Sequence, residues 1–193
     1  MARLVSVLGS VTPPGRLHRA VSAALESVQQ SFPRWEIDLI DLADYRLGFA
    51  DGRPLDQLKD DTPAVIGRIV SADAIVLATP VYRTSFTGAL KNLLDLIPVE
   101  GLAGKPCGII AMGATPHHYL GVDSQLRAAL AWFGALVAPN SVYLMPSDFF
   151  EGQPSPAARD EVTELMRSVL TLQIALRGLS HPLGPRPLAA RQT

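Results

Sequence analysis

The stretch Ala74–Ile97, AIVLATPVYRTSFTGALKNLLDLI, joins a short apolar run to a helical pattern through the polar segment Thr79–Thr87. The apolar run Ala74–Ala78 shows no alternation, which is typical of a strand buried on both faces of a parallel sheet. The helical pattern of Gly88–Ile97 places four apolar residues on one face, namely Leu90, Leu93, Leu94 and Ile97. A plain turn from strand to helix takes about 2–6 residues. The longer polar segment therefore predicts a loop shaped to hold a ligand at the end of a buried strand.

The rest of the chain repeats this alternation of strand and helix. Further strands are expected at Leu4–Leu8, Trp35–Leu42, Gly108–Met112 and Leu136–Leu144, with Trp35–Leu42 nearer an edge because it alternates in part. Helices are expected at Leu17–Gln30, Thr62–Ser71, Gly121–Phe133 and Pro156–Leu176, with Gly48–Asp61 as a connecting loop. The order predicts an α/β fold with a doubly wound parallel sheet of five strands. Ligands bind such sheets at the carboxyl ends of the strands, so the loops after Leu8, Ala78 and Met112 are the candidate site.

Composition limits the classes of function. The 193 residues suit one domain, expected over residues 1–177, with a proline-rich C-terminal tail over 178–193. Only 18% of the residues are charged and the formal net charge is -1, which argues against binding to nucleic acid or to membranes. The single cysteine, Cys107, excludes an internal disulfide and is expected to be a buried thiol. The N-terminus runs directly into a strand without the pattern of a signal peptide, so a soluble cytoplasmic protein is expected.

The first loop is followed by a helix whose first N–H groups are free to bind an anion. Its sequence, GSVTPPGRLHRAVSAAL over Gly9–Leu25, matches neither the P-loop nor the G-x-G-x-x-G fingerprint. A phosphate at the helix start would gain the hydroxyls of Ser10 and Thr12, the guanidinium of Arg16 and a donor from His18. The alternative, an ordinary turn with a solvated Arg16, stays open on these residues alone.

The second loop offers groups suited to a planar ligand. Pro80 stiffens the exit from the strand, and the backbone amides of Val81 and Tyr82 are expected to be free to face a ring edge. Tyr82 provides an aromatic wall, Arg83 a cation and Ser85 a hydroxyl. These side chains favour a flat, polar-edged ligand.

The third loop, MGATPHHYLG, again begins with small residues at a strand end. Gly113, Ala114 and Thr115 would bring backbone N–H groups close to a ring. The adjacent His117 and His118 do not favour a metal site, because neighbouring residues rarely converge on one ion. Together the three loops predict a site for a flat, phosphorylated ring system and no metal.

These motifs resemble the NAD(P)H-dependent FMN reductases of the flavodoxin-like superfamily, of the type that supplies reduced flavin to two-component monooxygenases. The most specific part is ATPVYRTSFTGALKNLLDLIP, Ala78–Pro98, and Gly9-Ser10, Arg16 and the Gly113–Thr115 turn also match. The resemblance implies a flavodoxin-like three-layer fold. It implies an FMN phosphate held by Ser10, Arg16, Leu17 and His18. It also implies a flavin ring bordered by Pro80, Val81, Tyr82, Arg83, Ser85 and the Gly113–Thr115 turn.

The resemblance also implies an activity. Hydride passes from NADH or NADPH to FMN, and FMNH2 goes to a partner flavin-dependent monooxygenase, with no catalytic acid, base or nucleophile demanded of the protein. Relatives of this type form dimers and tetramers, and the two apolar helices Gly88–Ile97 and Gly121–Phe133 agree with a homo-oligomer. A flavodoxin-type electron carrier is disfavoured by the nearly neutral charge. A quinone or azo reductase that uses the same hydride chemistry remains open.

Overall fold

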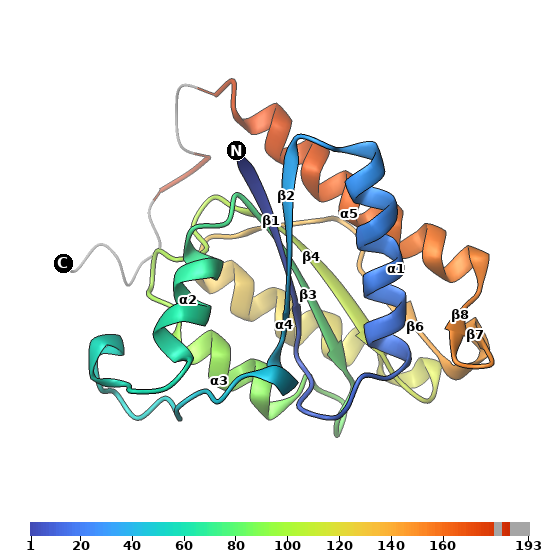
Figure 1. Cartoon of the computed structure of the whole chain (residues 1–193), viewed down its shortest axis with the longest axis horizontal. Helices are drawn as coiled ribbons and strands as arrows, with labels where there is room; N and C mark the ends of the chain where they lie inside the picture. Colours follow the sequence, from blue (N-terminus) through green and yellow to red (C-terminus); the bar gives the residue numbers. More distant parts are fainter. Residues whose placement is uncertain (180–182, 186–193) are drawn as a thin grey trace.

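A parallel sheet forms the centre of the computed structural model, which describes residues 1–179 and 183–185 (Figure 1). Its strands are β1 (Ala2–Leu8), β2 (Trp35–Asp41), β3 (Ala74–Pro80), β4 (Pro106–Met112), β5 (Leu136–Val137) and β6 (Val142–Leu144). The order is β2-β1-β3-β4-β5, β6 also pairs with β4, and all of these pairings are parallel. The predicted doubly wound sheet is confirmed, with the partly alternating β2 at its edge.

Helices cover both faces of the sheet. One face carries α1 (Arg16–Ser31) and α5 (Pro156–Leu176), and the other carries α2 (Thr62–Val70), α3 (Gly88–Leu96) and α4 (Tyr119–Trp132). Short 3-10 turns lie at Leu42–Asp44, Leu55–Gln57, Pro116–His118 and Pro146–Asp148, and a small hairpin pairs β7 (Phe149–Phe150) with β8 (Gln153–Pro154). The observed helices begin and end within two residues of the expected bounds.

The two faces of β1 show why its apolar run does not alternate. Leu4 and Leu8 pack into the cluster beneath α1 and α5, whereas Val5 and Val7 pack into the cluster beneath α2, α3 and α4. Both faces exclude water, so apolar side chains are favoured on both of them. Cys107 in β4 is fully buried, and this burial raises the pKa of its thiol to about 12, as suits a small apolar residue.

The fifth strand position departs from expectation. Leu136–Leu144 was predicted as one strand, but β5 ends at Val137 and β6 begins at Val142. Pro139 within the gap has no N–H to donate to a ladder. The chain leaves the ladder after Ala138, whose N–H donates to Cys107 O at 2.8 Å. The expected tail over 178–193 falls largely outside the described residues.

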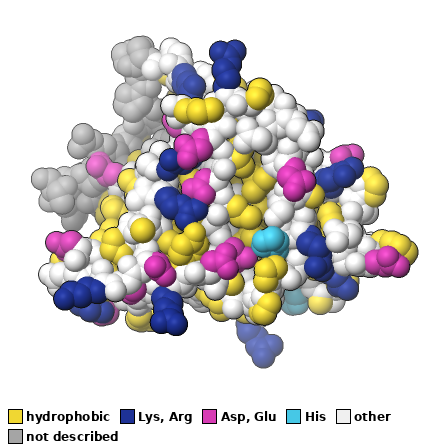
Figure 2. Space-filling model, viewed as in Figure 1, with side chains coloured by type: hydrophobic (Ala, Val, Ile, Leu, Met, Phe, Trp, Pro, Cys, Tyr) yellow, Lys and Arg dark blue, Asp and Glu magenta, His cyan; other side chains and the backbone are white. Residues whose placement is uncertain are grey.

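The strands run downward in Figure 1, so the loops that follow β1, β3 and β4 meet at the lower edge of the sheet. On the face drawn in Figure 2, basic and acidic side chains are interspersed. In the part of the chain that the structure describes, no helix combines the length and the apolar character needed to cross a membrane. The lower edge is where the predicted site must be sought.

Candidate functional site

Helix α1 begins with an open N-terminus. Its N-cap, Gly15, has no side chain to cap it, and its first turn holds no acidic residue. The first intrahelical bond runs from Arg19 N to Gly15 O at 3.1 Å. Within the described residues, the backbone N–H groups of Arg16, Leu17 and His18 have no acceptor. Free donors at the positive end of a helix dipole are suited to binding an anion.

The loop that leads into α1 is held close to β3 and α3. Gly9 N donates to Ala78 O at 2.7 Å, and a Cβ added at Gly9 would lie 2.8 Å from Leu90 Cβ. Glycine is therefore required for this close approach. Thr87 completes the junction, because its hydroxyl caps α3 by accepting from Leu90 N at 3.0 Å and donates to Gly9 O.

Two hydroxyls lie beside this open helix start. Ser10 Oγ and Thr12 Oγ1 are 2.8 Å apart, and Thr12 N donates to Ser10 Oγ at 3.3 Å. Both hydroxyls line the same hollow as α1. Both residues therefore lie beside the free donors of the helix N-terminus.

A hollow of about 220 Å³ joins the first loop to the second. Among the predicted site residues it is lined by Ser10, Thr12, Arg16, Leu17, His18, Pro80 and Tyr82, and its wall is completed by Leu8, Pro13, Pro14, Gly15, Asp41 and Met112. The structure does not bring Val81, Arg83, Ser85, Gly113, Ala114 or Thr115 into this lining. Segments distant in sequence therefore meet at the carboxyl edge of the sheet.

Asp41 is a lining residue that the sequence analysis missed. Its Oδ2 lies 3.9 Å from His18 Nε2, and its Oδ1 accepts from Ala43 N at 3.0 Å. The side chain is nearly buried at the end of β2. Its place near the end of the predicted strand Trp35–Leu42 was the available signal, but the charge pointed equally well to an exposed turn.

The second loop is a tight, strained turn. Arg83 and Thr84 have positive φ angles of 52° and 65°, and Tyr82 and Ser85 exchange backbone hydrogen bonds of 2.9 and 3.1 Å around them. Such a turn normally carries Asn and Gly, and each residue held in this backbone region costs about 1–3 kcal/mol. Helix α4 holds the turn in place: Ser85 Oγ donates to Gln125 Oε1, and a Cβ at Gly121 would lie 3.0 Å from Thr84 O. Gln125 and Gly121 are further residues that sequence reasoning missed.

The prediction that the amides of Val81 and Tyr82 are free is wrong. Val81 N donates to Met112 O at 2.8 Å, and Tyr82 N donates to Ser85 O. The reason is that the pairing of β3 with β4 continues one residue beyond Pro80 and passes directly into the turn. The second loop offers its side chains to a ligand, with Tyr82 half-exposed and Arg83 exposed.

The third loop has two free amides rather than the three expected. Gly113 N is used by the sheet, where it donates to Leu144 O at 3.0 Å. In the described chain, the N–H groups of Ala114 and Thr115 have no acceptor. A Cβ at Gly113 would lie 3.3 Å from Val81 Cγ2, so the second and third loops are in contact.

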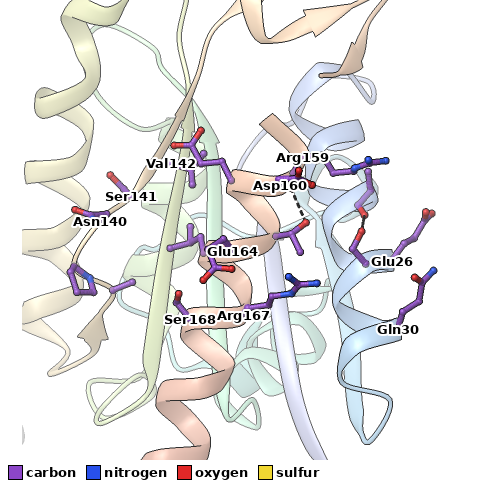
Figure 3. A pocket seen from close by; sticks show the side chains of 17 residues that line it. Glu26, Gln30, Asn140, Ser141, Val142, Arg159, Asp160, Glu164, Arg167 and Ser168 are labelled. Atoms are coloured by element: carbon purple, nitrogen blue, oxygen red, sulfur yellow. Dashed lines mark hydrogen bonds between the residues drawn. The ribbon is translucent and has the colours of Figure 1, made fainter. Parts of the chain in front are cut away.

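A larger hollow of about 1190 Å³ lies elsewhere, between α1, α5 and the segment 138–142 (Figure 3). In Figure 3, α5 with Glu164 and Arg167 runs through the middle, α1 with Glu26 and Gln30 lies to its right, and Asn140 and Ser141 lie to its left. Its two helix surfaces carry charges of both signs, and none of the loops after β1, β3 and β4 is part of its lining. The smaller hollow, with its converging donors, is the candidate site.

A doubly wound sheet with an open helix N-terminus and three converging loops at its carboxyl edge defines a nucleotide-binding α/β protein. Residues 2–149 match the family model described as NADPH-dependent FMN reductase. The chain belongs to this family. It is thus a flavodoxin-like enzyme that uses FMN and a nicotinamide nucleotide.

Three similar proteins agree with this assignment. An NAD(P)H-dependent FAD/FMN reductase from Geobacillus thermodenitrificans is 38% identical over 159 residues, which cover 81% of this chain and 86% of the relative. An FMN reductase (NADPH) from Pseudomonas aeruginosa is 35% identical over 149 residues, 76% of this chain and 78% of the relative. The crystal structure of an NADH:FMN oxidoreductase in its apo form superposes with a TM-score of 0.71 at 26% identity, covering 97% of this chain and 98% of that one.

Proposed function

We propose that this FMN reductase binds the FMN phosphate at the start of α1 and the flavin ring against the second and third loops. We further propose that it delivers reduced FMN to a partner flavin-dependent monooxygenase in the cytoplasm. One observation carries the placement of FMN: the free N–H groups of Arg16, Leu17 and His18 line the same hollow as Pro80 and Tyr82. Donors for a phosphate and a surface for a ring are thereby placed side by side.

The residues present at the first loop fit a phosphate. A dianion there meets the helix dipole, three backbone donors and the hydroxyls of Ser10 and Thr12. Arg16 lies at the first helical position and adds a charged donor. The Asp41 carboxylate is directed to Ala43 N, from which its Oδ1 accepts a hydrogen bond, and its Oδ2 lies 3.9 Å from His18 Nε2.

The residues at the ring end bind and orient rather than exchange protons. Bound FMN supplies the hydride-accepting chemistry. The protein supplies the Tyr82 side chain, the cation of Arg83 and the free N–H groups of Ala114 and Thr115. Donors at a ring edge stabilise negative charge that develops there during reduction.

The size of the hollow supports a flavin that enters and leaves. Pockets that enclose a ligand of this size typically measure about 300–1,000 Å³, whereas this hollow measures about 220 Å³. Part of the flavin would remain outside one protomer. An exposed flavin suits release to a second protein better than permanent retention does.

We also propose a homo-oligomer that forms through α3 and α4. A groove of about 350 Å³ between these helices is lined by Leu94, Ile97, Ala129, Trp132 and Phe133, with Lys91, Asp95 and Val99. Trp132 is 54% exposed and its ring meets that of Phe133 edge to face at 5.0 Å. A second copy of the same helix pair offers an apolar and a charged surface of matching extent.

Steady-state oxidation of NADH and NADPH tests the activity, with FMN, FAD and a quinone offered in turn. We expect the largest kcat/KM with FMN. Filtration of an anaerobic reaction mixture should then find reduced FMN in the protein-free filtrate. Efficient quinone reduction by protein that keeps its flavin through filtration would contradict the proposed role in supply.

A further inference from the structure

The third loop is held at both ends by consecutive residues of β6. Gly113 N donates to Leu144 O at 3.0 Å, and Tyr143 Oη donates to Thr115 O at 2.7 Å. The Tyr143 hydroxyl lies directly over the Cα of Gly113, because a Cβ built there would overlap it. Tyr143 therefore contacts both the first and the last residue of the Gly113–Thr115 turn.

The Tyr143 ring is itself fixed by its neighbours. It meets the ring of Tyr119 edge to face, with centroids 5.6 Å apart and an interplanar angle of 65°. The Tyr119 hydroxyl accepts from Ser141 Oγ at 3.3 Å and makes no bond to the third loop. Burial raises the pKa of the Tyr143 hydroxyl, which keeps the proton that it donates.

The hydrogen bond to Thr115 O fixes the orientation of the free N–H donors of the loop. Because the Thr115 carbonyl is held by Tyr143 and Gly113 by the sheet, the two peptide groups between them have little freedom to rotate. Those peptides carry the N–H groups of Ala114 and Thr115 that have no acceptor in the described residues. Fixed donors bind a ring edge with a smaller ordering cost than mobile ones.

We infer that Tyr143 is a positioning residue that sets the third loop for binding the flavin ring through its hydroxyl. The inference rests on the proposed placement of the ring. It assigns Tyr143 no contact with the ring and no part in proton transfer. Its effect is expected on the ring end of FMN and not on the phosphate end.

The test compares Tyr143→Phe with Tyr119→Phe as a matched control. Each variant removes one hydroxyl from the same aromatic pair, but only Tyr143→Phe removes a bond to the third loop. Affinities are measured by fluorescence titration with FMN and with lumiflavin, which has the ring without the ribityl phosphate. The KM for FMN, kcat and the Tm are measured alongside.

We expect Tyr143→Phe to weaken FMN and lumiflavin by the same factor, about three- to tenfold, as for loss of one hydrogen bond. The KM for FMN should rise by more than kcat falls. Tyr119→Phe should change both affinities by less than about twofold, even if its Tm falls as much.

Two results would overturn the inference: an unchanged lumiflavin affinity in Tyr143→Phe, whether or not the FMN affinity falls, or equal losses in the two variants. The last would mean that packing of the pair, rather than the Tyr143 hydroxyl, matters. If the wild-type protein reduces FMN and Tyr143→Phe leaves both flavin affinities unchanged, this inference alone is refuted. Wild-type protein that binds neither flavin refutes it together with the proposed placement of FMN.

Discussion

Arg16 is the residue on which the phosphate assignment depends most. It is the first residue of α1, lines the hollow beside the second loop and stands next to two further free backbone donors. Arg16→Ala removes a charge-assisted hydrogen bond to the phosphate but keeps the backbone N–H. Bonds of this kind contribute about 1.5–3 kcal/mol. Because Arg16 is exposed to solvent, the lower part of that range applies, which is roughly a 10- to 30-fold loss of FMN affinity.

Riboflavin supplies the control for this substitution, since it has the same ring without the phosphate. Isothermal calorimetry with both ligands should show a loss for FMN and a change of less than about twofold for riboflavin. Arg34→Ala removes the same charge near the opposite end of α1 and serves as the matched variant. Its FMN affinity should stay near that of the wild type at physiological salt, because charges more than about 8 Å apart are then largely screened from each other.

The reasoning fails if FMN and riboflavin shift by the same small factor in Arg16→Ala. Arg16 would then be a solvated residue at a helix start. Its substitution would change the free energy of unfolding by no more than about 0.5 kcal/mol. An equal loss of FMN affinity in Arg34→Ala would also contradict a direct contact, because it would assign the effect to net charge.

Three further outcomes are expected. Calorimetry should give tighter binding of FMN than of FAD, because the first loop receives a terminal phosphate; equal or tighter binding of FAD would count against that placement. Trp132→Glu should dissociate the oligomer, which light scattering would detect as a smaller molar mass. A monomeric wild type at micromolar concentration would refute the α3–α4 interface. Burial acts to raise the pKa of Asp123, but the hydrogen bonds from Arg127 and the Arg127 charge lower it overall. Because the folded-state pKa is the lower one, this stabilisation is present above the unfolded value and is lost as pH falls through the folded value. Asp123→Asn should therefore cost about 0.5–1 kcal/mol at pH 7, and the Tm difference from wild type should narrow below about pH 4; a constant difference would contradict this.

The fold could be predicted from the sequence because strands buried on both faces leave continuous apolar runs. The runs around Leu4 and Ala74 became β1 and β3, each with side chains in both clusters. The break in the fifth strand could not be predicted in the same way. The segment Leu136–Leu144 stays apolar on average, and the break depends on how Pro139 and its neighbours leave the ladder beside β4.

Some of the side chains that line the hollow could be anticipated from the sequence, but the hydrogen bonds around it could not. The small residues and hydroxyls of the first loop could be located from their place after a predicted strand. The use of Val81 N by Met112 O depends on strand register, which the local sequence does not determine. Tyr143 and Gln125 act from elements distant in sequence, and a single chain carries no signal that pairs them with Thr115 and Ser85.

The crystal structure of the FMN complex tests the central claim most directly. We predict that the phosphate lies within hydrogen-bond distance of the backbone N–H groups of Arg16, Leu17 and His18. The ring should lie beside Tyr82 and the Gly113–Thr115 turn. A phosphate bound elsewhere, for example among Arg159 and Arg167 in the hollow between α1 and α5, would contradict the account.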